Sequence, residues 1–149
     1  MKKVALWAVM LALVFVVSAV SVQAEVVLTG SSRVGDVLVA LNRVYMDKNP
    51  GAVVTINFDL LHKAQDHVLA GEADAVMVTD KYYKELKTDT LKFTPVAKRV
   101  VKRDGKIVGY HTYGIAAVRI SAELQKFLGF ISSAAGKEIL KSIPNVDPL

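Results

Sequence analysis

Apolar residues recur along this chain with two periods, one typical of buried strands and one typical of amphipathic helices. From Val34 to Tyr45 they recur at helical spacing and form one continuous stripe, which predicts a helix that ends before Pro50 and Gly51. A second helix is predicted from Leu60 to Ala70. The predicted strands are the β-rich runs Glu25–Leu28, Ala52–Phe58 and Ala73–Thr79. This alternation with short loops indicates an α/β fold, a single lobe with a mainly parallel sheet flanked by helices.

The second half of the chain predicts a hairpin followed by two helices. Asp104-Gly105 lies between two β-like runs, which is a strong signal for a two-residue hairpin turn. Asp59 is predicted to be the N-cap of the second helix, and Ser133 that of the last one. The remaining predicted elements are a short helix and loop over Asp80–Lys92, a strand over Tyr113–Val118, and helices over Ser121–Ile131 and Ala134–Ser142.

The first residues have the pattern of a secretory signal peptide. Lys2 and Lys3 precede an apolar run over residues 4–17, and the small residues Val22 and Ala24 follow at cleavage-site spacing. We therefore expect cleavage after Ala24 and an exported, periplasmic or secreted protein. The alternative is a retained membrane anchor, because the apolar run is almost long enough to span a bilayer.

Residues 25–149 are long enough for one domain with a real core. The sequence contains no cysteine, which excludes disulfides and thiol chemistry within it. The formal net charge of +5 falls to +3 without Lys2 and Lys3. That charge is too small to argue for nucleic acid as a partner.

No catalytic motif stands out in the chain. His62 and His67 are five residues apart, so a helix would not place them on one face, and we predict neither a metal site nor a cofactor. The carboxylates mostly neighbour lysines, as on an ordinary solvated surface. We therefore expect a protein that is not an enzyme.

The predicted hairpin carries the densest run of cations, from Lys98 to Lys106. The five residues are Lys98, Arg99, Lys102, Arg103 and Lys106. They could meet an acidic partner or an anionic membrane surface. Alternatively, they are a charged edge that blocks edge-to-edge aggregation, an interpretation that needs no partner.

Small and hydroxylated residues follow the first predicted strand. Ligands of open parallel sheets bind beyond the carboxyl ends of the strands, where helices begin. Thr29, Gly30, Ser31 and Ser32 lie at one such end, and Thr79 closes the third strand at the same edge. These residues either cap the helix that follows or bind an oxyanion, which needs hydrogen-bond donors more than full countercharge.

Three stretches together resemble the first lobe of type II periplasmic solute-binding proteins, in particular the molybdate and phosphate binders of ABC transporters. They are "GSSRVGDVLVALNRVYMDKNPGAVVTINF", "VLAGEADAVMVTD" and "AELQKFLGFISSAAGKEIL". The resemblance implies an exported oxyanion-binding protein that works with an ABC transporter membrane subunit. It also implies that Ser31, Ser32 and the Thr29–Gly30 backbone are donors, with Thr79 as a further hydroxyl.

The chain departs from this family in two ways. Between Asp80 and Tyr113 there is room for a hairpin but not for a second lobe. Asp59 stands where the family has a second loop rich in Ser and Gly. If it faces the site, the like charge costs an anion roughly 3 kcal/mol, more than the roughly 2 kcal/mol that a helix N-terminus returns. We therefore expect weak or partner-dependent binding, aided by self-association, or alternatively a lobe that binds no anion and acts as a protein-interaction module.

Overall fold

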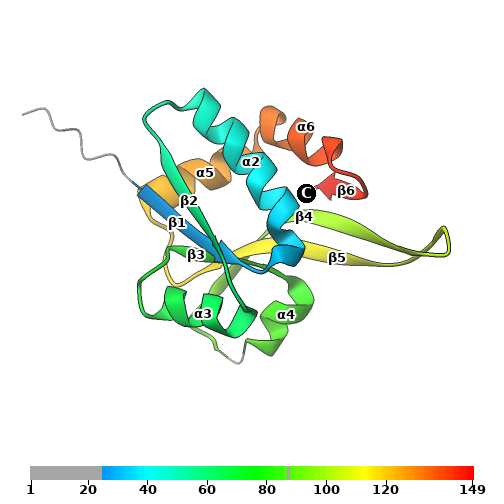
Figure 1. Ribbon diagram of the computed structural model, residues 1–149, viewed down its shortest axis with the longest axis horizontal. Coiled ribbons are helices and arrows are strands. Elements are labelled where there is room, and N and C mark those ends of the chain that lie inside the picture. The colour runs from blue at the N-terminus through cyan, green and yellow to red at the C-terminus, as the bar shows by residue number, and fades with distance from the viewer. Residues whose placement is uncertain (1–24, 87) are drawn as a thin grey trace, which may run out of the picture.

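The computed structural model describes residues 25–86 and 88–149, so the predicted signal peptide lies outside the described residues. These residues form one lobe around a six-stranded sheet with strand order β2-β1-β3-β5-β4-β6 (Figure 1). The strands are β1 (Glu25–Gly30), β2 (Val53–Phe58), β3 (Ala75–Thr79), β4 (Lys92–Arg103), β5 (Lys106–Ala117) and β6 (Val146–Pro148).

Helices cover both faces of this sheet. The helical segments are η1 (Ser32–Val34, a short 3₁₀-helix), α2 (Gly35–Lys48), α3 (Leu61–Leu69), α4 (Asp80–Glu85), α5 (Ala122–Ser132) and α6 (Ala134–Ser142). Helices α2, α5 and α6 lie on one face, and α3 and α4 lie on the other (Figure 1). Within the described part of the chain, no helix is both long enough and apolar enough to cross a membrane.

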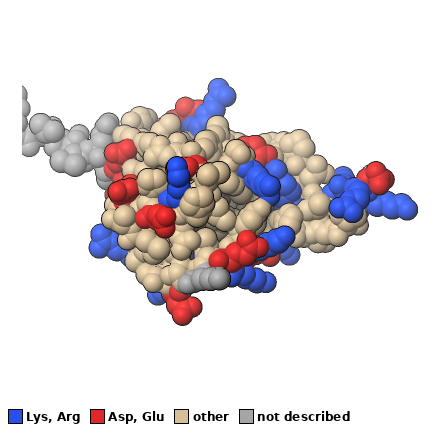
Figure 2. Space-filling model, turned by 60° about the horizontal axis from the view of Figure 1, so that its bottom comes forward, with Lys and Arg blue, Asp and Glu red and all other residues tan. Residues whose placement is uncertain are grey.

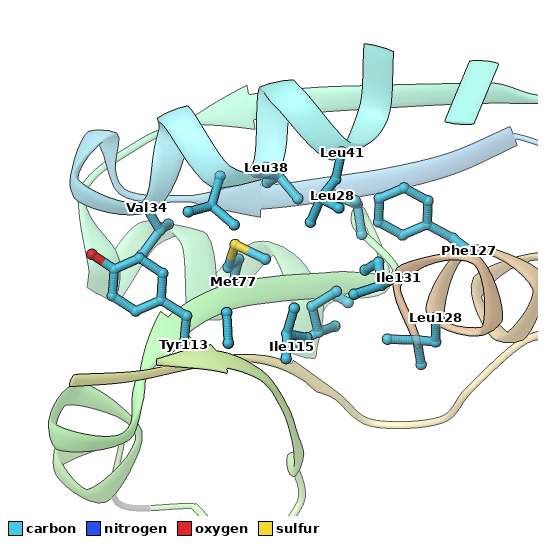
Figure 3. Packing of buried hydrophobic residues seen from close by; sticks show 14 of the residues in the cluster. Leu28, Val34, Leu38, Leu41, Met77, Tyr113, Ile115, Phe127, Leu128 and Ile131 are labelled. Carbon is cyan, nitrogen blue, oxygen red and sulfur yellow. The ribbon is translucent and has the colours of Figure 1, made fainter. Parts of the chain in front are cut away.

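The larger of two cores lies between the sheet and helices α2, α5 and α6. Phe127, Leu38 and Leu41 from these helices are fully buried, and they pack over Leu28 and Met77 from β1 and β3 (Figure 3). Strands buried on both faces are typical of α/β folds, which explains why β3 reads as a continuous apolar run.

The predicted fold class is confirmed, with one difference in the sheet. β1 pairs in parallel with β2 and with β3, as the alternation of strands and helices predicted. The pairs β3–β5, β4–β5 and β4–β6 are antiparallel, so the sheet is mixed rather than mainly parallel. The cause is the hairpin, which returns the chain along β5 and places that strand directly against β3.

Of the two predicted N-caps, Ser133 is confirmed and Asp59 is not, while Ser121 is a cap that was not predicted. The hydroxyls of Ser121 and Ser133 accept the N–H groups of residues three positions later, at 3.2 Å each. Asp59 is not the N-cap of α3, and that part of the prediction was wrong. Its carboxylate accepts the N–H of Leu60 at 2.7 Å, and Leu60 occupies the cap position without a side-chain hydrogen bond.

The hairpin turn at Asp104-Gly105 is confirmed. Both residues have positive φ, 51° and 74°, as a two-residue type I′ turn requires. β5 joins the predicted β-like run after the turn to the predicted strand over Tyr113–Val118, as one continuous strand that ends at Ala117. Only its second half pairs with β3, so the outer half of the hairpin projects beyond the lobe as two strands alone (Figure 1).

Candidate functional site

Ser31 and Ser32 lie where β1 passes into η1, at the carboxyl end of the parallel strands. Ser31 has an extended backbone and is half-buried, while Ser32 is exposed. The Ser31 carbonyl accepts the N–H of Val34 at 3.2 Å, but its hydroxyl does not cap the helix. Neither hydroxyl makes a hydrogen bond with the residues that the structure describes, so capping does not account for the serine pair.

Gly30 and Thr29 belong to β1 itself and not to the loop after it, which corrects their predicted place. A Cβ on Gly30 would lie 3.0 Å from the carbonyl oxygen of Met77, so a larger side chain would press against β3. The Gly30 carbonyl also accepts the N–H of Asp59 at 3.0 Å, which joins the ends of β1 and β2. Gly30 therefore supports the loop through close backbone packing.

Thr29 faces away from the serines, toward α3. Its side chain is 1% exposed, and its hydroxyl oxygen has no hydrogen-bond partner among the described residues. It lines a cavity of about 150 Å³ that it shares with Asp59 and His67. In a strand, the side chains of consecutive residues point to opposite faces of the sheet. Because the predicted strand ended at Leu28, Thr29 was placed in the loop and its direction was not predicted from this alternation.

Asp59 and His67 form a polar cluster with Glu72 beside that cavity. The imidazole Nδ1 of His67 lies 2.5 Å from the carboxylate of Glu72, and Nε2 lies 3.6 Å from that of Asp59. The hydrogen bond that His67 donates to the Glu72 carboxylate raises the pKa of His67, while the hydrogen bond from the Leu60 N–H lowers the pKa of Asp59. The Asp59 carboxylate is thus held toward the imidazole, in a different cavity from the one that Ser32 lines.

Thr79 caps the helix that follows it. Its hydroxyl accepts the N–H of Tyr82 at 3.4 Å, and its side chain is 7% exposed. Tyr82 in turn accepts a hydrogen bond from Arg33, whose guanidinium carbon lies 5.7 Å from the centre of the tyrosine ring. The structure therefore brings the end of β3 beside η1, as predicted, but the Thr79 hydroxyl already has a local role.

Sequence reasoning did not assign Arg33, which follows the serines, or Arg99, which pairs with Asp36 of α2, to the site. Arg99 of β4 pairs with Asp36 in the first turn of α2, and its guanidinium lies 5.1 Å above the ring of Tyr113. The Tyr113 hydroxyl donates to the carbonyl of Arg33 at 3.4 Å, and burial raises the pKa of that hydroxyl. The Nε of Arg99 is buried and lacks a partner among the described residues.

We call Ser31, Ser32, Arg33 and Arg99 the rim. The hydroxyls and guanidiniums of the rim are hydrogen-bond donors, and Asp36 is the acidic group beside them. Ser32 and Asp36 also line an open groove of about 450 Å³ along α2. In the described ranges, no three His, Asp or Glu side chains are arranged to hold a metal ion. This chemistry suits a small anion that accepts several hydrogen bonds.

No protein-family model and no curated protein matches this chain. Solved structures do match it. Reduced OxyR from N. meningitidis has a TM-score of 0.63 at 8% identity, covering 84% of this chain and 98% of that one. A Corynebacterium glutamicum OxyR C206 mutant has a TM-score of 0.57 at 10% identity, covering 93% and 73%.

A third similar structure, from Clostridium difficile, is described as the substrate-binding domain of a molybdenum ABC transporter. Its TM-score is 0.55 at 11% identity, and the match covers 84% of this chain and 99% of that one. At these identities the likeness shows the fold alone. The chain has a fold like that of type II periplasmic binding proteins, reduced to one lobe.

Proposed function

We propose that this lobe binds a small tetrahedral oxyanion of the molybdate, tungstate or phosphate class at the rim, as the exported solute-binding component of an ABC-type uptake system. The observation that carries the proposal is the pair of hydroxyls on Ser31 and Ser32. They have no partner among the described residues, and they lie at the carboxyl end of β1, where the next residue is Arg33 and where Asp36 of α2 holds the guanidinium of Arg99. Hydrogen bonds to a charged acceptor contribute about 1.5–3 kcal/mol each, more than those between neutral groups.

The position of the rim in the fold supports the same function. Parallel strands end there and α2 begins just beyond it, so the positive end of the helix points toward the loop. Arg99 is held in place by Asp36 and over the ring of Tyr113. A guanidinium fixed in this way loses little further freedom when it binds an anion.

One lobe leaves its anion half in water, which limits the affinity. Two or three useful hydrogen bonds at a net 1.5–2 kcal/mol each sum to about 4–5 kcal/mol, which corresponds to a dissociation constant near 1 mM. We therefore expect millimolar binding by a monomer.

Titration calorimetry with molybdate, tungstate, phosphate and sulfate tests this proposal on a preparation that light scattering shows to be monomeric. Arg99→Gln should abolish the binding heat, whereas Lys102→Gln, an equal loss of charge further out on the same strand, should leave it unchanged. Equal titration curves for Arg99→Gln and the parent protein would place the anion elsewhere. A micromolar constant from the monomer would contradict the argument that this is half a site.

The proposal that the protein is exported rests on the signal-peptide pattern of its first residues. The intact mass of the protein recovered outside the cytoplasm should correspond to a chain that begins at Glu25. A mass that includes residues 1–24 would support the retained anchor instead.

A further inference from the structure

We propose that a second copy of this chain pairs antiparallel with the free edge of β5 and places its own hairpin turn beside the rim. This inference rests on four features. The hairpin has an open backbone edge, exposed apolar side chains along that edge, and a length that fixes the register. The fourth feature is that Lys106 of one copy would lie beside Asp80 of the other. None of these depends on the anion.

The backbone edge of β5 is open beyond Thr112. β3 pairs with β5 only as far as Thr79, which lies opposite Tyr113. At the next position outward, the Thr112 N–H donates to the side chain of Asp80 at 3.2 Å, so this N–H points away from β4. Strand N–H groups alternate in direction, so the N–H and carbonyl of Tyr110 also point away from β4, and the sheet offers them no neighbouring strand.

The side chains along this edge lack the usual protection against pairing. Edge strands are normally guarded by charges or prolines, yet the run from Ile107 to Thr112 contains no Lys, Arg, Asp, Glu or Pro, and His111 is its one titratable residue besides Tyr110. Ile107, Val108 and Tyr110 are 56%, 55% and 60% exposed. The cations lie instead on β4 and at the turn, where they gather at the projecting end with one acidic side chain (Figure 2).

The length of the free run fixes its register. A partner strand cannot extend past Thr112, because Thr79 of β3 already occupies the position opposite Tyr113. The Thr112 N–H is already bound by Asp80, so the free run extends from Ile107 to His111, and it pairs with its own copy when Gly109 faces Gly109. Nothing lies within 4 Å of the Cβ position of Gly109, so two backbones can approach there. The β4–β5 register shifts between Val101 and Lys102, so we expect the strongest pairing around Tyr110.

This register also matches charges between the two copies. Lys106 of each copy faces Thr112 of the other, whose N–H is held by Asp80. The two-fold axis thus creates two equivalent contacts, each between the Lys106 ammonium of one copy and the Asp80 carboxylate of the other. The cations on β4 lie on the opposite side of the hairpin from this contact. Opposite charges at the end of an interface favour this register over its neighbours.

Pairing would bring the second copy to the rim. Asp80 follows Thr79, and its neighbour on α4, Tyr82, contacts Arg33. The turn of the second copy carries Arg103 and Lys106, so it would add cations and cover the exposed side of a bound anion. This last step rests on the proposed function, whereas the pairing itself does not.

Light scattering over a concentration series, without added anion, tests the pairing. The parent protein should pass from monomer to a dimer of twice that mass. Tyr110→Pro removes an N–H that points away from β4, so the hairpin should persist, while the dimer dissociation constant should rise at least tenfold. Tyr110→Ala is the matched control, because it keeps the backbone edge and should retain most of the dimer. Circular dichroism establishes that each variant is folded.

Charge reversal tests the register. Lys106→Glu should weaken the dimer, and Lys106→Glu combined with Asp80→Lys should restore it, whereas Lys102→Glu on the other strand should have little effect. A monomer at all concentrations, or a dimer that survives Tyr110→Pro unchanged, would overturn the proposal.

Added molybdate separates the pairing from the rim. If the partner completes both rims, saturating molybdate should tighten the dimer by the square of the factor by which dimerisation tightens molybdate binding at each rim. If Tyr110→Pro breaks the dimer but molybdate does not change the dimer dissociation constant, the edge pairing is supported. The proposal that the second copy covers the rim is then overturned.

Discussion

The two halves of the sheet are built on different principles. In the parallel half, β3 is buried at every position and helices cover both faces. In the antiparallel half, the outer parts of β4 and β5 pair only with each other and are exposed on both faces. The parallel half derives its stability from packing, whereas the hairpin has little beyond its own ladder and turn.

The candidate site lies where these halves meet. The serine loop belongs to the parallel half, and Arg99 and Tyr113 belong to the strands that run out into the hairpin. The ion pair between Arg99 and Asp36 links residues 63 positions apart, and the Tyr113 hydroxyl reaches the carbonyl of Arg33. A rigid half thus positions the hydroxyls, and the base of a projecting half supplies a guanidinium.

The largest expected effect separates the two halves by stability. Phe127 is fully buried and lies edge-on to Tyr45, with ring centres 5.1 Å apart. Phe127→Ala should lower the free energy of unfolding by about 3–5 kcal/mol, because the cavity adds to the lost burial. Ile107→Ala on the hairpin should change it by less than about 0.5 kcal/mol. Urea unfolding measures both, and equal losses would mean that the hairpin folds as part of the same core.

The sequence predicted the parallel half better than the other half, for a physical reason. Helix stripes, β-branched runs and breakers act within a few residues, and they predicted β1, α2, β2, α3 and β3 in the right order. The turn at Asp104-Gly105 is equally local. That β5 would insert beside β3, and that Val146–Pro148 would pair with β4, depends on contacts between distant residues, which no local pattern contains.

The candidate site divides along the same line. Ser31 and Ser32 were identified from local composition, and the structure leaves their hydroxyls without a capping role. Thr29 was placed in the loop because β1 was predicted two residues too short. Arg99 was read as one of several surface cations, since only the tertiary fold sets it on Tyr113 and against Asp36. The sequence around Arg99 has pairs of apolar residues between pairs of cations and no strict alternation, so no local pattern singles out this arginine.

The next prediction tests whether the parallel half supplies the main donors. Replacing Ser31 and Ser32 together by Ala should weaken molybdate binding by roughly 100-fold, because two hydrogen bonds to a charged acceptor are lost. Ser132→Ala, an exposed serine on α5, is the control and should leave the binding constant unchanged. Calorimetry on both variants gives the comparison. An unaltered constant for the double variant would assign the anion to the arginines alone.

A smaller effect is expected from the carboxylate that pairs with Arg99. Asp36→Asn removes a negative charge beside the rim and leaves Arg99 free for the anion, so the affinity should rise by about tenfold, the effect of roughly 1.4 kcal/mol. Asp66→Asn on α3 makes the same change in net charge away from the rim and should alter the affinity far less. A fall in affinity for Asp36→Asn would show that Asp36 chiefly orients Arg99.

The smallest effect concerns His67, whose neighbours belong to the parallel half. Glu72 and Asp59 raise the pKa of the imidazole, so the stability from these contacts is fully present below about pH 6.5 and is lost as the pH rises through the folded-state value. The pKa of Asp59 is lowered, so its share is present above about pH 3.8 and is lost as the pH falls through its own folded-state value. His67→Gln should therefore lower the melting temperature most between these limits and least at about pH 9. The shift should be small and should shrink with salt, because these groups are exposed.

His62→Gln is the matched control, since His62 lies on the same helix and makes no ion pair with the described residues. A His67→Gln shift of constant size from about pH 5 to about pH 9 would mean that the side chain acts through packing and not through its charge.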